Sequence, residues 1–327
     1  MARSPNTILP DLRSLLAAHG LDGAREEPFA HLGFSGARLT RLIRSDGERF
    51  VLKRMSIERD WIMRATDDAG CREARLAQAH VRLPDGVKNA ALAAALDADE
   101  CALLMRDISP WLLPGAVNED QLDLILRRMA ELHSAPVPVE MDAAWCDAGR
   151  RLTLLTPQTA GIAASYGAPV ARDLIEGWRI FEEFAPTRVA TLIRELAAGP
   201  SPLLRALGGL PAAFLHGDLK FDNIGLDEGG RMWLIDWAMT LVAPPAVELG
   251  WFLAINSRRM SAPLDDVLAR YAGNAGIAPE HRARHDALAV MCGLLLRGWR
   301  KALDADGGES EELRWWCERV EAATPLL

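Results

Sequence analysis

Lysine, tyrosine and cysteine are scarce in this sequence. Of the 37 basic side chains among its 327 residues, four are lysine and the other 33 are arginine, and there are two tyrosines and five cysteines. The cysteines are scattered, odd in number and without C-x-x-C spacing, which argues against a disulfide framework and against a cysteine zinc site. We therefore expect reduced and mostly buried thiols. Because lysines are so few, each of their positions is informative.

Signals for membranes, secretion and nucleic acids are also missing. The longest apolar run, Ala287–Leu296, is far shorter than the roughly 20 residues of a membrane span. The start of the chain, Met1–Pro5, lacks the apolar core of a signal peptide. A formal net charge of −8 argues against a general nucleic-acid binder. The sequence thus predicts a cytoplasmic protein without membrane or nucleic-acid partners and leaves its oligomeric state open.

The chain is long enough for two lobes, and its first 105 residues mix helix and strand patterns. Two short apolar runs are separated by Asp46-Gly47, and Asp-Gly between such runs is a strong hairpin signal. We predict an N-terminal lobe over residues 1–105 with a small mixed β-sheet. Its expected helices cover 8–19 and 70–80, and its expected strands cover 37–44, 49–53 and 101–105.

A hinge is expected at residues 106–110, because Pro110 cannot continue a strand ladder. The remainder, 111–327, has mainly helical patterns and forms the larger C-terminal lobe of the prediction. Asn118 can cap a helix together with Gln121 three residues later. Residues 136–169 are rich in proline and glycine and weak in period, so a loop-like insertion is expected there. Further helices are expected over 171–196 and 265–323.

The chemistry is concentrated in Phe214–Ile224 and Trp233–Trp237. Two apolar strand-like runs each lead to a carboxylate, Asp218 and Asp236, and a hairpin between them would bring Asn223 close to Asp236. Carboxylate and amide oxygens are the hard ligands that Mg²⁺ prefers. Phosphoryl transfer also needs a carboxylate to orient and deprotonate the attacking hydroxyl. The stretch therefore predicts the catalytic and magnesium-binding core of an ATP-dependent phosphotransferase.

Each of these residues also has an ordinary structural interpretation. A single aspartate beside a glycine is commonly a turn residue, and His216 alone is more often a hydrogen-bonded structural histidine than a base. The combination His-Gly-Asp-x-Lys-x-x-Asn followed by a strand and Asp-Trp is far more specific than its members. No G-x-x-x-x-G-K-[ST] motif occurs, which removes the P-loop alternative.

The motif His216–Asn223 and the triplet Ile235–Trp237 resemble the aminoglycoside phosphotransferase and choline kinase-like family, which is related to the eukaryotic-like protein kinases. The resemblance implies an α+β, two-lobed, protein kinase-like fold with ATP in the cleft. It implies that Asp218 is the catalytic aspartate, with Lys220 close to the transferring phosphate. Asn223 and Asp236 match the magnesium ligands of the family.

The nucleotide side follows from the same resemblance. Lys53 matches the lysine that pairs with the α and β phosphates, and Glu73 on the next helix matches its carboxylate partner. The glycine loop departs from the G-x-G-x-x-G of protein kinases, although its backbone N–H groups and serine can contact phosphate. We assign five further residues to nucleotide binding: Gly33, Ser35, Gly36, Met105 and Ile108.

Another departure is Glu248, which stands where the family usually carries an aspartate that steadies the catalytic loop. The acceptor implied by the family is a small-molecule hydroxyl. The acidic stretch Asp304–Glu312 could attract a cationic acceptor such as an aminoglycoside or choline, but an acidic surface stretch is more often simply solvated, so it does not name the acceptor. Tryptophans at helical positions are mostly core, and a subset can stack on a ring or cation. Those of the C-terminal lobe are Trp145, Trp178, Trp251, Trp299, Trp315 and Trp316.

Two other functions stay open from the sequence. A catalytically silent nucleotide-binding protein is disfavoured because the lysine, aspartates and asparagine of the motifs are all intact. A protein kinase is disfavoured by Gly217, where such enzymes usually carry arginine, and by the lack of a recognisable activation segment.

Overall fold

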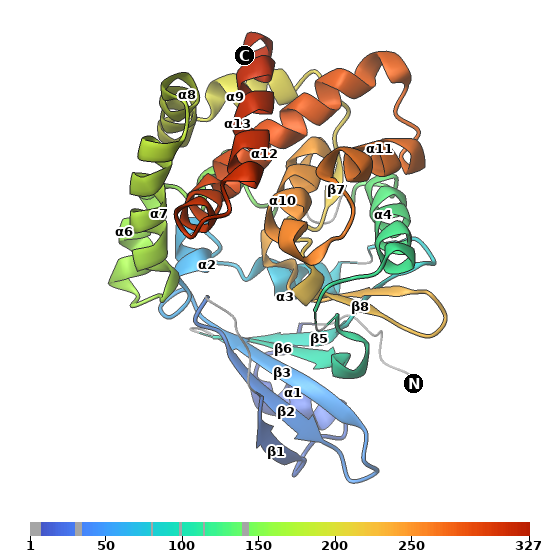
Figure 1. The fold of residues 1–327 in the computed structure, drawn as a ribbon. Coiled ribbons are helices and arrows are strands. Elements are labelled where there is room, and N and C mark those ends of the chain that lie inside the picture. Colours follow the sequence, from blue (N-terminus) through green and yellow to red (C-terminus); the bar gives the residue numbers. More distant parts are fainter. Residues whose placement is uncertain (1–7, 30–34, 80, 98–99, 114, 139–143) are drawn as a thin grey trace.

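The computed structural model describes residues 8–29, 35–79, 81–97, 100–113, 115–138 and 144–327. Its N-terminal part is built on an antiparallel five-stranded sheet in the order β1-β2-β3-β6-β5. Figure 1 shows this sheet on one side of the molecule and the helical part on the other. The strands are β1 (Arg25–Pro28), β2 (Arg38–Ile43), β3 (Arg49–Met55), β5 (Ala91–Leu96) and β6 (Cys101–Arg106).

Side chains alternate between the two faces of the sheet along each strand, and each face is covered by a helix. Val51 and Leu103 belong to a core shared with α3 (Arg72–Gln78), whereas Leu52 and Leu104 belong to a core shared with α1 (Leu12–Ala18). A short helix, α2 (Trp61–Ala65), lies between β3 and α3. The predicted hairpin and both predicted helices of this lobe are present. All five cysteines are free and buried, as expected.

The larger part is helical and is organised around α12, which spans Pro279–Asp306. Helices α7 (Val170–Phe184), α10 (Ala246–Asn256) and α13 (Ser310–Ala323) pack against it. The remaining helices are α4 (Glu119–His133), α5 (Ala148–Thr153), α6 (Pro157–Ser165), α8 (Thr187–Ala198), α9 (Ser201–Leu207) and α11 (Leu264–Asn274). The predicted capping box is confirmed: Asn118 accepts from the Gln121 N–H at 2.9 Å, and Gln121 accepts from the Asn118 N–H at 3.1 Å.

The expectation of a loop-like insertion over 136–169 was wrong, because α5 and α6 lie within it. The buried face of α6 is made of alanines, Ala160 and Ala163, so its apolar period is weak in the sequence. Two of the prolines that suggested a loop instead mark helix starts: Pro157 occupies the first position of α6, where proline costs no hydrogen bond, and Pro169 precedes α7.

Two small sheets hold the central motif. Strand β7 (Ala213–Leu215) pairs antiparallel with β10 (Leu241–Ala243), and β8 (Ile224–Leu226) pairs antiparallel with β9 (Met232–Leu234). Strand β4 (Val87–Asn89), which comes before the expected hinge, joins β9 in parallel. The catalytic-loop candidate 216–223 therefore connects β7 to β8. Each of these strands is paired with another strand, so the loop is fixed at both ends. No helix in the described part of the chain is long and apolar enough to cross a membrane.

Candidate active site

The loop after β7 turns sharply at Gly217, whose backbone φ is +83°. A Cβ at this position would lie 1.9 Å from the carbonyl oxygen of Met239. Only glycine fits both the left-handed backbone and this close approach. The turn sends Asp218 out of the β7 core and into a cavity that Asp236 and Lys53 also line.

His216 braces the loop. Its Nδ1 accepts a hydrogen bond from the Asp218 N–H at 3.2 Å, and its Nε2 donates to the carbonyl of Ile235 at 3.0 Å. These two partners require the neutral ring, and burial accordingly lowers the pKa of His216. The imidazole thus links the backbone of Ile235 to that of Asp218. This is the structural role of a hydrogen-bonded histidine that the sequence analysis had considered for His216.

Glu248 braces the same loop from α10. Its carboxylate accepts from the backbone N–H groups of His216 and Gly217, and it lies 2.8 Å from Nε2 of His133. Burial would raise the pKa of Glu248, but the hydrogen bonds from His133 and Gly217 hold it below its ordinary value. The longer glutamate therefore reaches the loop that an aspartate steadies in the resembling family.

Asp218 lies among hydrogen-bond donors. Nζ of Lys220 is 2.9 Å from its carboxylate, and the side-chain amide of Asn223 donates to the same oxygen at 3.0 Å. Burial would lower the pKa of Lys220, but Asp218 and Asp236 raise it, so the ammonium stays charged. The structure thus brings three of the predicted residues together within one loop.

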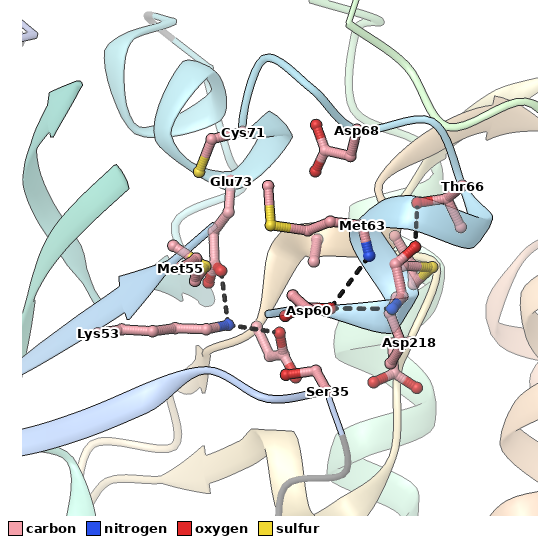
Figure 2. Close-up of a pocket in the computed structure, with 14 residues that line it drawn as sticks. Ser35, Lys53, Met55, Asp60, Met63, Thr66, Asp68, Cys71, Glu73 and Asp218 are labelled. Carbon is pink, nitrogen blue, oxygen red and sulfur yellow. Dashed lines mark hydrogen bonds and ion pairs between the residues drawn. The ribbon is translucent and has the colours of Figure 1, made fainter. Parts of the chain in front are cut away.

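Lys53 connects the two parts of the molecule. Its Nζ lies 2.7 Å from Glu73 on α3 (Figure 2). It also lies 2.7 Å from Asp236, which precedes the single turn η4 (Trp237–Met239). Burial would lower the pKa of Lys53, yet Asp236 and Glu73 raise it well above its usual value. Asp236 itself has a left-handed backbone, with φ of 65°. Aspartate adopts this conformation more readily than most non-glycine residues, and residues held in it cluster at functional sites.

The donor set at the end of the hairpin fits magnesium. Asn223 and Asp236 offer an amide oxygen and a carboxylate, and Lys53 and Lys220 hold the pKa of Asp236 low although burial opposes this. The described residues contain no group of three or more His, Cys, Asp or Glu side chains that could hold a metal by themselves. Nucleotide-bound Mg²⁺ needs only one or two protein ligands, because phosphates and water complete its shell.

The glycine-loop prediction is covered only in part, because Gly33 lies outside the described residues. Ser35 lines the cavity that also contains Lys53 and Asp218 (Figure 2). At Gly36 the φ is +105°, and a Cβ would lie 2.1 Å from the carbonyl oxygen of Arg59. The need for glycine at position 36 is therefore explained by packing against the linker before α2.

The two residues predicted beside the hinge are deeply buried. Met105 is 5% exposed in the core shared with α3, and Ile108 is 3% exposed next to Gly225 on β8. Neither lines the cavity with Lys53 and Asp218. Their assignment to nucleotide binding remains a prediction.

Sequence reasoning missed two buried arginines beside the site. Arg72 on α3 donates to the carbonyls of Ala144 and Ala238 at 2.7 and 2.6 Å, and Arg151 on α5 donates to the carbonyl of Gly217 at 2.6 Å. Arginines are abundant in this chain, so nothing in the local sequence distinguishes these two. Their roles depend on contacts with residues 66 or more positions away.

A sequence profile of the phosphotransferase enzyme family matches residues 32–288, which is 257 of the 327 residues. The chain belongs to this family. The enzyme class and family that the central motif predicted are thereby confirmed. No curated protein sequence is significantly similar to the chain.

Solved structures share the fold at low sequence identity. An amicoumacin kinase is 13% identical with a TM-score of 0.50, and the match covers 97% of this chain and 95% of that one. An ethanolamine kinase from Plasmodium vivax is 12% identical with a TM-score of 0.51, covering 95% of this chain and 85% of that one. The predicted α+β, two-lobed kinase-like fold is confirmed.

Proposed function

We propose that this phosphotransferase uses Mg²⁺ and ATP to phosphorylate a hydroxyl group of a small molecule. One observation carries the proposal: Lys53 and Glu73 from the N-terminal part and Asp218 and Asp236 from the C-terminal part line a single cavity. The amicoumacin kinase that shares the fold was solved in complex with AMP-PNP and Ca²⁺, which supports the use of a nucleotide and a divalent cation.

Each residue has a distinct part in the proposed reaction. Lys53, oriented by Glu73, binds the α and β phosphates, while Asn223 and Asp236 hold the magnesium ion that neutralises phosphate charge. Asp218 accepts the proton of the acceptor hydroxyl while the oxygen of that hydroxyl bonds to the γ-phosphorus. The bond from that phosphorus to the β–γ bridging oxygen breaks, ADP leaves, and Lys220 stabilises the charge of the transferring group.

The test is ADP release measured over a panel of hydroxyl acceptors for the wild-type protein and for Asp218→Asn. Loss of the proton acceptor and of its orienting charge is expected to reduce acceptor-dependent turnover by at least about a hundredfold. Asp222→Asn is the matched control, because its side chain is 66% exposed and pairs with Arg259 at the surface.

The other outcomes are equally informative. Turnover that survives in Asp218→Asn would refute the role of Asp218. Nucleotide binding without turnover over the whole panel would favour a catalytically silent protein, and phosphate transferred to proteins in place of small molecules would favour a protein kinase.

A further inference from the structure

A cluster of four side chains beside the catalytic loop has donors without acceptors. Its members, which we call the donor cluster, are Arg151 on α5, Trp251 on α10, and Arg297 and Trp299 on α12. Nη1 of Arg151, Nε of Arg297 and both indole N–H groups are buried and have no hydrogen-bond partner among the described residues. Buried donors are normally paired, because an unpaired one costs the full desolvation free energy.

The donor cluster is held together by stacking. The guanidinium of Arg151 lies 4.6 Å from the ring centre of Trp251, and that of Arg297 lies 5.9 Å from Trp251 and 4.8 Å from Trp299. Arg151 is only 2% exposed, whereas Arg297 is partly exposed. The cluster is therefore most deeply buried at Arg151 and lies nearest the surface at Arg297.

Its position is next to the reacting group. Arg151 donates through Nε to the carbonyl of Gly217, the residue before Asp218. Burial lowers the pKa of Arg151 and lowers the pKa of Arg297 to about 10. The negative charge of Asp218 raises the pKa of both guanidinium groups. Both remain cationic at neutral pH, so two positive charges lie close enough to Asp218 to interact with its charge.

The carboxylates nearby are already engaged by other cations. Asp304 accepts from Arg258 and from Arg300 at 3.0 Å each, and Glu312 pairs with Lys301 at 2.7 Å. Oδ2 of Asp304 is buried without a hydrogen-bond partner among the described residues, and the charges of Asp304 and Glu312 raise the pKa of Arg297. Even so, neither Arg151 nor Arg297 forms an ion pair with a carboxylate of the described residues. An ammonium group would be repelled here, whereas an oxyanion would satisfy the unpaired donors.

We infer that the acceptor of this enzyme is an acidic hydroxyl compound, whose carboxylate or phosphate group binds at the donor cluster while its hydroxyl faces Asp218. The inference rests on the proposed phosphotransfer. The two arginines provide the charge, and the two indole N–H groups provide additional donors.

The experiment uses four acceptors of one skeleton: glucose, glucosamine, glucuronate and glucose 6-phosphate. Acceptor-dependent ADP release gives KM and kcat, and calorimetry in the presence of AMP-PNP and Mg²⁺ gives binding without turnover. We expect a KM at least about tenfold lower for an acidic member than for glucose, because hydrogen bonds to charged groups are the stronger ones. Comparison of the carboxylate with the phosphate identifies the oxyanion.

Arg297→Gln should raise the KM for the acidic acceptor about 10- to 100-fold and abolish the preference over glucose, and Arg297→Lys should restore part of it. AMP-PNP binding to each variant shows whether the nucleotide site is intact. Arg282→Gln, which removes a surface ion pair with Asp286 on the same helix, is the matched control. It should change neither the KM for the acidic acceptor nor the KM for glucose.

Several results would overturn the inference. These are a preference for glucose or glucosamine, an acidic preference that Arg297→Gln does not change, and no binding of either acidic member. If an acidic member binds in an Arg297-dependent way but ADP is never released, the anion site stands and the proposed phosphotransfer is refuted.

Discussion

Gly217 shows how little freedom the catalytic loop has. Because its φ is +83° and a Cβ would meet Met239 at 1.9 Å, Gly217→Ala forces the turn to move and displaces Asp218. We expect a loss of at least about 2 kcal/mol in unfolding free energy, from backbone strain and the clash together, and a fall in kcat. Urea unfolding and ADP release measure both effects.

Gly161→Ala is the control for this prediction. It lies in α6 with nothing within 4 Å of the added methyl group, so the substitution should stabilise the helix by about 0.5–1 kcal/mol. Equal behaviour of the two variants would contradict the account of Gly217.

Asp227 stabilises the turn between β8 and β9, which lies between Asn223 and Asp236 in the chain. Its carboxylate accepts from the N–H groups of Gly229 and Arg231 and from the indole of Trp233 at 2.9–3.0 Å. Burial opposes ionisation, but these hydrogen bonds lower the pKa of Asp227 to about 2. Since the unfolded value is near 4, the group stabilises the folded state above about pH 4, and this contribution is lost between about pH 4 and pH 2.

Asp227→Asn is therefore expected to be less stable than the wild type at pH 6.5 by on the order of 1–2 kcal/mol. The difference in unfolding free energy should shrink as the pH is lowered from 5 to 3, measured by urea unfolding at each pH. A difference that stays constant over this range would show that the charge of Asp227 contributes nothing.

Arg72 links helix α3 to three other segments of the chain. The guanidinium joins three backbone carbonyls from separate segments: Ala144, Ala238 just after Asp236, and Thr66 before the helix. Arginine suits this role because its planar fork donates in several directions at once. The same helix carries Glu73, whose carboxylate accepts from the Trp237 N–H at 3.2 Å. Arg72 thereby sets the distance between α3 and the proposed metal ligand.

Arg72→Met is expected to reduce the affinity for AMP-PNP and Mg²⁺ at least about tenfold and to lower the unfolding free energy by about 2–4 kcal/mol, because at least two buried carbonyls lose their donor. Arg75→Met, on the exposed side of the same helix, should change both little. Calorimetry and urea unfolding give the two quantities. Nucleotide affinity unchanged in Arg72→Met would refute a positioning role.

Elements with strong local signals were predicted well from the sequence. The Asp46-Gly47 turn gave the β2–β3 hairpin, and the Asn118–Gln121 capping box gave the start of α4. Elements that depend on distant partners were missed. Strand β4 has three residues and is defined by pairing with β9 more than 140 positions later. Helix α2 was missed for another reason, because it has only five residues.

The candidate site divides in the same way. Residues within one continuous motif, such as Asp218 and Asn223, were found because their spacing is specific, and Lys53 stood out among only four lysines. Arg72 and Arg151 were not found, because their partners are backbone carbonyls, which any residue provides. Sequence motifs therefore predict the candidate reacting groups together with Glu73 and Glu248, whereas the two buried arginines beside the site are seen only in the tertiary structure.

At the scale of the whole molecule, Lys53 is an ion-pair link between the two lobes. It is 7% exposed and pairs with Glu73 from its own lobe and Asp236 from the other. Nucleotide phosphates and magnesium would compete for both ends of the Lys53–Asp236 pair. On the proposed function, binding would exchange one link between the lobes for another, and the same residues would contribute to stability and to nucleotide affinity.

These two contributions can be separated by Lys53→Met. Removing the ammonium leaves Glu73 buried without its cation, which is expected to cost about 3–5 kcal/mol of unfolding free energy, since burial already raises the pKa of Glu73. Adding Glu73→Gln removes the unpaired charge and should recover much of that loss in urea unfolding. Neither variant should show the thermal stabilisation by ATP and Mg²⁺ expected of the wild type. A double variant that regains nucleotide-dependent stabilisation would mean that Lys53 acts on the fold alone.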